Sequence, residues 1–245
     1  MSLLRPLAIA FAFLTRLPVQ LGEVADTDVG RALACFPVVG LALGMVLAGV
    51  AWLAPTLPPS VTAVGLVALL AAFTGGLHLD GLADVFDALG GSHGDRDRML
   101  AIMRDSRIGA HGALALFLAM LAKVSAVGAL VQRRSLWPIV LFPAIARWSA
   151  VLLIVAFPYA RDEGLGRRFK ERSSVVEVVW ATAFSVLLLF AAGARALTPT
   201  AVALAAALGF GVWMRRRLGG LTGDVYGAAI ELAEIAFVAV AARGA

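Results

Sequence analysis

The chain has 245 residues, of which 61% are hydrophobic and only 15% are charged, and its mean hydropathy is +0.90. A soluble globular domain carries roughly 25% charged residues, so the composition excludes that class and predicts an integral membrane protein. The single cysteine excludes a disulfide framework. The net charge of +5 does not indicate nucleic-acid binding, because the basic residues lie mainly between apolar runs, where membrane topology explains them.

No linker, repeat or low-complexity stretch divides the chain, so we expect a single integral-membrane domain over residues 1–245. The predicted fold is all-α, a polytopic membrane helical bundle of about seven transmembrane helices. A short helix precedes them, because the apolar run 6–20 falls below the ~20 residues that cross a bilayer. We expect this helix to be interfacial or re-entrant. A secretory signal is disfavoured, since no small-residue cleavage site follows.

The spans themselves are predicted from the apolar runs. They cover 32–54, 61–77, 112–131, 136–157, 175–194, 198–214 and a last stretch that contains Glu231 and Glu234. Gly40 and Gly44 stand four residues apart in the first span, a spacing that favours close approach of a neighbouring helix. The second span leads directly into polar residues, so its helix is expected to continue or to kink at Gly75 and Gly76.

Three carboxylates follow the second span at helical spacing. Asp80, Asp84 and Asp87 stand at i, i+4 and i+7, which places them on one face of a helix. Oxygen ligands suit a hard cation such as Mg²⁺, whereas zinc is disfavoured because the chain has no Cys/His spacing pattern. Acidic residues at this spacing also form solvated helix faces. Between long apolar runs, however, unpaired carboxylates are costly, which favours a metal site.

The longest polar segment, residues 90–111, is rich in glycine and arginine. A planar guanidinium binds two phosphate oxygens at once, so arginines close to a metal cluster favour phosphate binding. Topology alone accounts for Arg96 and Arg98, whereas we interpret the part from 104 to 111 as functional. The candidate residues there are Arg104, Asp105, Ser106, Arg107 and His111.

Two basic residues, Lys123 and Arg147, lie in the middle of predicted spans. Charges at this depth are rare and usually face the interior of a bundle, so we expect interior partners for both. The last span offers such partners. Asp224, Glu231 and Glu234 follow a near-helical spacing, which again places carboxylates on one face.

A second glycine-rich motif, residues 219–227, contains Thr222 and Asp224 just before the last span. Backbone N–H groups of such a turn can bind phosphate, although glycine-rich turns also serve packing alone. With seven spans, most lysines and arginines fall on one side of the membrane, which the positive-inside rule makes cytoplasmic. The other side has only Arg133, Arg134, Arg195 and Arg243. The three polar motifs all fall on the basic side, so we expect one site that faces the cytoplasm.

Three segments carry a resemblance to a known family. GGLHLDGLADVFDALGG, MRDSRIGAHG and GGLTGDVYGAAIELAE resemble, in order and with similar spacing, the motif regions of the cobalamin synthase family, the adenosylcobinamide-GDP ribazoletransferases. The resemblance covers nearly the whole chain, with a mild departure at Ala88, where glycine is expected in many relatives. It implies an enzyme of the cell inner membrane, in the last stage of cobalamin biosynthesis. Such an enzyme joins adenosylcobinamide-GDP to α-ribazole or its 5′-phosphate, releases GMP and requires Mg²⁺.

That chemistry gives each candidate residue a predicted role, since phosphoryl transfer depends mostly on positioning and on neutralising oxygen charge. The predicted metal ligands are Asp80, Asp84, Asp87, Asp105 and Glu231. The predicted phosphate- and substrate-binding residues are Arg104, Ser106, Arg107, Lys123, Arg147 and Thr222. The general base is left open among His78, His111 and Asp224, and a metal-bound alkoxide needs none. The lipid bilayer is the expected environment, and an oligomer is compatible with the sequence.

Two other functions are left open by the residues. DGLAD, residues 80–84, is similar to the opening of the CDP-alcohol phosphotransferase signature, but Asp84 stands where that signature has a basic residue. A cation transporter that uses the carboxylates of both acidic motifs is the second alternative. It is disfavoured because the charged motifs gather on one side, whereas an ion path needs polar residues in both halves of the membrane. A purely structural role is least favoured, because it gains nothing from buried charges.

Overall fold

The structure is a computed structural model that describes residues 4–244, and within this range all regular elements are helices. The α-helices are α1 (Leu4–Leu14), α2 (Asp26–Ala32), α3 (Phe36–Leu53), α4 (Pro59–Thr74), α5 (Leu77–Gly91), α6 (Arg96–Ile102), α7 (Ala110–Gln132), α8 (Trp137–Ala156), α9 (Leu165–Arg172), α10 (Val175–Ala192), α11 (Leu197–Leu218) and α12 (Gly223–Gly244). Short 3₁₀ turns at Leu33–Cys35 and Ala194–Ala196 lead into α3 and α11.

The predicted membrane bundle is confirmed. Between residues 4 and 244, six helical segments are long and apolar enough to cross a bilayer, and the bent pair of α4 and α5 makes a seventh if it is counted as one span. The first of these segments joins α2, the following 3₁₀ turn and α3 into one stretch, Asp26–Leu53. α1 has only 11 residues and is too short to cross, as predicted for the N-terminal helix.

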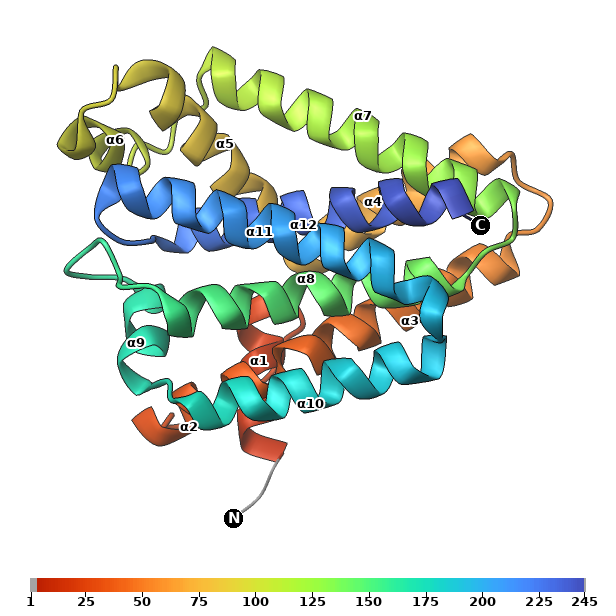
Figure 1. Cartoon of the computed structure of the whole chain (residues 1–245), viewed down its shortest axis with the longest axis horizontal. Helices are drawn as coiled ribbons and strands as arrows, with labels where there is room; N and C mark the ends of the chain where they lie inside the picture. Colours follow the sequence, from red (N-terminus) through yellow and green to blue (C-terminus); the bar gives the residue numbers. More distant parts are fainter. Residues whose placement is uncertain (1–3, 245) are drawn as a thin grey trace.

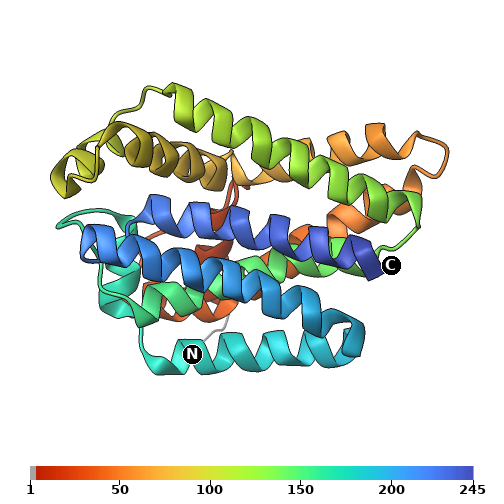
Figure 2. The same ribbon diagram turned by 45° about the horizontal axis from the view of Figure 1, so that its top comes forward.

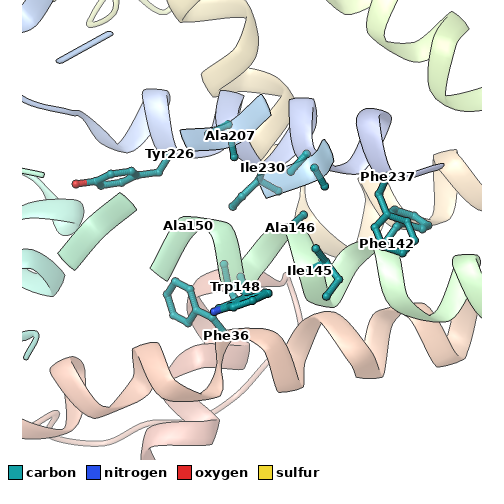
Figure 3. Close-up of a cluster of buried hydrophobic side chains, with 14 of the residues drawn as sticks. Phe36, Phe142, Ile145, Ala146, Trp148, Ala150, Ala207, Tyr226, Ile230 and Phe237 are labelled. Atoms are coloured by element: carbon teal, nitrogen blue, oxygen red, sulfur yellow. The ribbon is translucent and has the colours of Figure 1, made fainter. Parts of the chain in front are cut away.

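Helix α8 lies at the centre of the bundle, packed against α3, α10, α11 and α12 (Figure 1). α12 in turn lies between α8 on one side and α5 and α7 on the other (Figure 2). The side chains between α8 and its neighbours are almost all apolar, as Figure 3 shows for Phe142, Ile145 and Phe237. Because α12 packs against both α8 and α5, its polar residues can meet those of α5.

The glycine pair of α3 makes the close approach that its spacing predicts. A Cβ atom at Gly40 would lie 2.4 Å from the carbonyl oxygen of Pro143, and one at Gly44 would lie 2.0 Å from that of Val140. Both neighbours are backbone atoms of α8 and cannot rotate away. The pair therefore determines the distance between α3 and the central helix.

We expect Gly44→Val to destabilise the folded protein by about 1–3 kcal/mol or more, because the new side chain must push the backbones of α3 and α8 apart. The measurement is thermal unfolding of the purified protein in detergent. Gly49→Val is the matched control, since nothing lies within 4 Å of a Cβ atom at that position. Equal melting temperatures of the two variants would contradict the close-packing account.

Large apolar side chains cover the outside of α7 and α10. Phe117, Leu118 and Leu121 are exposed on α7, and Val186, Leu187 and Phe190 are exposed on α10. Only 11% of the apolar stretch of α10 is buried inside the protein. Such a surface is stable when it faces lipid, where all backbone polar groups are satisfied within the helix.

Three short helices were not predicted from the sequence. α6 falls in the polar segment 90–111, α2 lies just before the first predicted span, and α9 lies between the predicted spans 136–157 and 175–194. Each is rich in charged residues and seven or eight residues long, so the apolar periodicity that identifies a helix is missing from them. Contacts hold them in place instead. Asp26 of α2, for example, accepts hydrogen bonds from Arg168 and Arg172 of α9.

The bend between α4 and α5 is the feature that positions the site. Gly75 and Gly76 have φ angles of +62° and +70°, in the left-handed region that favours glycine, and the two helices meet at 90°. The predicted kink is thereby confirmed. Because of this turn, α5 leaves the direction of α4 and runs towards the end of the bundle that holds α6, α9 and the start of α12 (Figure 1).

Candidate active site

Asp80, Asp84 and Asp87 lie on α5, as predicted. The charges of Asp80, Asp224 and Asp87 all act on the carboxylate of Asp84, which is itself partly buried. Within residues 4–244, neither Asp80 nor Asp84 forms a side-chain hydrogen bond or an ion pair. Burial and this accumulation of like charge, which Arg161 offsets only in part, make the ionised carboxylate of Asp84 costly, so the arrangement is one that a cation stabilises.

Asp87 differs from its two neighbours, because it is used to join helices. Its carboxylate accepts hydrogen bonds from the backbone N–H groups of Gly109, at 2.7 Å, and Gly112, at 2.8 Å. These groups belong to the N-terminus of α7, where a negative charge is also favoured by the helix dipole. A Cβ atom at Gly112 would lie 2.3 Å from Asp87 Oδ2, so only glycine allows this contact.

A glycine also allows α5 to touch α12. A Cβ atom at Gly81 would lie 2.7 Å from the backbone oxygen of Asp224 and 3.0 Å from its Cα atom. The first acidic motif and the second glycine-rich motif are therefore in direct backbone contact. The sequence predicted that both motifs lie on one side of the membrane, and in the structure they are neighbours.

We expect Gly81→Ala to lower activity about tenfold or more and also to lower the melting temperature, because the added methyl group must push the backbones of α5 and α12 apart and so separate the carboxylates of α5 from Asp224. Activity and thermal unfolding are to be measured on the same preparation. Gly65→Ala, at an open position on α4, is the control. If Gly81→Ala retained full activity, the contact between α5 and α12 would be irrelevant to the site.

Asp224 is held by an arginine that the sequence did not single out. Arg161 Nη2 donates a hydrogen bond to Asp224 Oδ2 at 2.6 Å, and both side chains are largely buried. Thr222 lies two residues earlier, and its hydroxyl accepts a hydrogen bond from the N–H of Val225 at 3.3 Å. Thr222 thus caps the start of α12, which accounts for its position without a substrate.

The loop that carries Arg161 is fixed by backbone hydrogen bonds to the same turn. The N–H of Ala160 donates to the carbonyl of Leu221, and the N–H of Leu221 donates to the carbonyl of Pro158, both at 2.8 Å. These two bonds hold Arg161 beside Asp224. In the sequence, Arg161 is one of many basic residues in a loop, so no pattern distinguished it.

A cavity of about 250 Å³ opens beside this pair. Asp80, Arg161 and Asp224 contribute its charged groups, and five aromatic rings contribute much of its wall. One of them is Tyr159, whose pKa is raised by burial, so its hydroxyl is protonated at neutral pH and can donate a hydrogen bond. The cavity therefore combines a charged end with an apolar, aromatic end.

A second cavity, of about 430 Å³, lies against the bend between α4 and α5. Its polar lining includes Arg16, Asp80, Asp84 and Ser106. The side chain of Arg16 packs directly over Gly75, where a Cβ atom would lie 2.1 Å from its Nε atom. Asp80 is thus common to both cavities.

The deep charges form a closed network, and the prediction of interior partners is confirmed. Lys123 Nζ donates to Glu231 at 2.5 Å and to Glu234 at 2.6 Å, and Arg147 also pairs with Glu234. All four side chains are at most 5% exposed. None of these four side chains lines the 250 Å³ or the 430 Å³ cavity. They border a void of about 10 Å³ or lie in the core. This placement favours a structural role over the predicted phosphate and metal roles of Lys123, Arg147 and Glu231.

His78 connects the network to the site. Its Nδ1 atom lies 3.3 Å from Arg147 Nη2. A guanidinium can only donate, so Nδ1 accepts and the ring proton resides on Nε2. Nε2 has no partner in the part of the chain that the structure describes, and His78 borders the smaller cavity. In this state His78 is a hydrogen-bond donor, which disfavours its predicted role as a general base.

The segment from 104 to 111 is mostly exposed. Arg107 donates hydrogen bonds to Asp105, which lower the pKa of Asp105 to about 2 and keep it ionised. His111 is exposed, although its ring packs closely over Gly90. Arg104 is exposed as well, so Ser106 is the predicted residue of this segment that reaches a cavity.

The predicted magnesium ion can be compared with these side chains. Over residues 4–244, no three His, Cys, Asp or Glu side chains converge tightly enough to hold an ion by themselves. Mg²⁺ usually takes one or two carboxylates and completes its shell with water and substrate phosphate. The unpaired carboxylates of Asp80 and Asp84, with Asp224 nearby, fit that mode of binding.

Fold and site together define a polytopic helical membrane protein with an acidic, arginine-containing site at one end of the bundle. Comparison with known sequences is more specific. The chain belongs to the cobalamin-5-phosphate synthase family, whose family model matches residues 6–242. It is therefore an enzyme of cobalamin biosynthesis, and the family that the sequence resembles is confirmed.

Individual relatives match over nearly their whole length. The chain is 42% identical to the adenosylcobinamide-GDP ribazoletransferase of Pseudomonas paraeruginosa (strain DSM 24068 / PA7), over 95% of the chain and 96% of the relative. Identity to the enzyme of that name from Geotalea daltonii is 41%, over 95% of each chain. For the one from Klebsiella pneumoniae subsp. pneumoniae it is 40%, over 94% of the chain and 96% of the relative. No solved structure matches the chain.

Proposed function

We propose that this protein transfers the phosphocobinamide moiety of adenosylcobinamide-GDP to α-ribazole, or to α-ribazole 5′-phosphate, and releases GMP in a Mg²⁺-dependent reaction. The names of the relatives support the donor and the ribazole acceptor. One observation carries the proposal. The carboxylates of Asp80 and Asp84 have no ion-pair partner within residues 4–244, and they lie near the salt bridge between Arg161 and Asp224. This combination of charges suits a diphosphate and its counter-ion.

The reaction exchanges one phosphorus–oxygen bond for another. A ribazole hydroxyl oxygen bonds to the phosphorus attached to cobinamide, and the bond from that phosphorus to the oxygen of the GMP leaving group breaks. The hydroxyl proton goes to a base or to water. Negative charge grows on the leaving phosphate, so groups that neutralise oxygen charge lower the barrier.

Asp80 and Asp84 are the residues that would hold Mg²⁺, and the bound ion would neutralise the diphosphate. The other three predicted ligands are less available. Asp87 accepts two backbone hydrogen bonds, Asp105 is paired with Arg107, and Glu231 is paired with Lys123.

Two cations are placed to bind phosphate oxygens. Arg161 borders the smaller cavity and is held in place by Asp224, and Arg16 borders the larger cavity. Among the three predicted bases, Asp224 also borders that cavity as a hydrogen-bond acceptor, whereas His111 is exposed and Nε2 of His78 carries a proton. We therefore favour Asp224 as the group that receives the hydroxyl proton, either directly or through water.

The proposed location is the cell inner membrane, with the site facing the cytoplasm. The end of the bundle that carries α6, α9 and the start of α12 has most of the arginines of the connecting segments, and the opposite end has Arg133, Arg134 and Arg195 (Figure 1). The positive-inside rule then places the basic end in the cytoplasm. The soluble nucleotide-linked donor would reach the site from that side.

The proposal is tested with purified protein in lipid, given adenosylcobinamide-GDP, α-ribazole and Mg²⁺. We expect GMP release that requires all three additions and stops on chelation of the metal. Parallel samples receive a CDP-alcohol and a hydroxyl acceptor. Consumption of the CDP-alcohol in place of adenosylcobinamide-GDP would support the alternative phosphotransferase. Divalent-cation flux into sealed vesicles without any GMP release would support the transporter.

A further inference from the structure

Asp80 borders two cavities of different character, and this arrangement has a consequence for how two reactants bind. The smaller cavity lies between α12, α8 and the loop of Arg161, and the larger one lies against the bend between α4 and α5. Leu77 and Asp80 of α5 line both cavities. A group bound in either cavity would therefore reach the carboxylate of Asp80.

The smaller cavity has aromatic walls. Phe169 lies 4.6 Å from Phe13 and 5.5 Å from Phe36, measured between ring centroids, and Tyr159 lies 6.4 Å from Tyr226. All five rings border the cavity. Figure 3 shows Phe36 projecting from α3 and Tyr226 projecting from α12, with Ala150 of α8 between them. Rings arranged in this way favour a flat aromatic ligand through stacking and edge contacts.

The larger cavity has the opposite character. Arg16 and Ser106 supply a guanidinium and a hydroxyl, and Asp80 and Asp84 supply carboxylates. The cavity is lined by residues of the exposed segment before α7, and a bulky group can extend out of it. A guanidinium opposite two carboxylates suits a diphosphate that arrives with a divalent cation.

We infer that the two reactants occupy separate cavities that meet at Asp80. The planar base of the acceptor nucleoside lies among the aromatic rings of the smaller cavity, and the diphosphate of the donor lies beside Arg16 in the larger one. This inference rests on the proposed function. The bulky corrin macrocycle of the donor exceeds either cavity, and the larger one adjoins the exposed segment before α7, where that group can extend outside. Phosphoryl transfer needs the nucleophile and the leaving group on opposite sides of phosphorus, and two separate cavities leave room for that arrangement.

Two substitutions should separate the two substrates. Phe169→Leu removes a ring but keeps most of its volume, and we expect it to raise the KM for α-ribazole about three- to tenfold. The KM for adenosylcobinamide-GDP should change less than about twofold. Arg16→Gln should do the reverse, with a rise of about tenfold or more in the KM for adenosylcobinamide-GDP alone. Phe117→Leu, on the lipid-facing surface, and Arg243→Gln, at the far end of the bundle, are the matched controls.

A binding measurement distinguishes failure of this inference from failure of the proposed function. Calorimetric titration of α-ribazole into the protein, without donor or metal, should show three- to tenfold weaker binding to Phe169→Leu than to the wild type. Should that variant not fold, Tyr159→Leu compared with Tyr159→Phe tests the same cavity. An active wild type in which both variants raise both KM values equally, or the wrong one, overturns the inference. A wild type that binds α-ribazole among these rings but releases no GMP overturns only the proposed function.

Discussion

Asp84→Asn is expected to lower the rate of product formation by about 100- to 1000-fold while the protein remains folded. The substitution keeps the shape of the side chain and removes its charge. In the wild type this carboxylate lies within the field of Asp80, Asp224 and Asp87, and it forms no ion pair within residues 4–244. Because this charge forms no stabilising contact, its removal should not lower the stability of the folded protein, whereas it should abolish most of the activity.

The control for this variant is Asp97→Asn, because Asp97 lies on α6, which packs against α5, but its side chain is 88% exposed. Product formation is measured at saturating Mg²⁺ and again over a metal titration. We expect full activity from Asp97→Asn, and a need for more Mg²⁺ in any activity left in Asp84→Asn. Wild-type rates from Asp84→Asn would show that the acidic face of α5 is not the reaction site.

Glu234→Gln is expected to destabilise the protein by about 3–5 kcal/mol, the largest stability effect that we predict. Glu234 is fully buried and pairs with both Lys123 and Arg147. With the neutral glutamine, the two buried cations are left with a single buried carboxylate, that of Glu231. The loss of a buried partner costs far more than the loss of an exposed one, because the remaining charges cannot be solvated.

Unfolding of purified protein in mixed micelles measures this effect. Glu171→Gln is the matched control, since Glu171 makes a 2.6 Å ion pair with Arg167 on the exposed surface of α9. We expect its unfolding curve to overlay that of the wild type, because exposed pairs contribute little. If Glu234→Gln unfolded with the same midpoint as Glu171→Gln, the network would not stabilise the bundle.

The spans and the acidic face could be predicted because their signals are local. Apolar runs identify helices by length alone, and the i, i+4, i+7 spacing of Asp80, Asp84 and Asp87 fixes their common face once a helix is assumed. The partners of Lys123 and Arg147 could be predicted for a similar reason. A buried charge needs an opposite charge, and the last span supplied the glutamates at that depth.

The residues that complete the site could not be predicted in the same way, because tertiary contacts select them. Arg161 and Arg16 lie in basic, irregular segments where many arginines look alike. Only the backbone pairing of residues 158–160 with Leu221 brings Arg161 to Asp224, and only the turn at Gly75 brings Arg16 to the acidic face. Asp87 illustrates the converse, because its spacing indicated a ligand whereas the structure uses it to hold the start of α7.

The most direct test of the proposed transfer follows one phosphorus atom. Adenosylcobinamide-GDP labelled at the phosphorus next to cobinamide is given to the purified protein in lipid with α-ribazole and Mg²⁺, and both products are separated and counted. The account predicts that all transferred label is found in the cobalamin product, with an equal amount of unlabelled GMP. Label released in the nucleotide, or as free phosphate, would contradict transfer of the phosphocobinamide moiety.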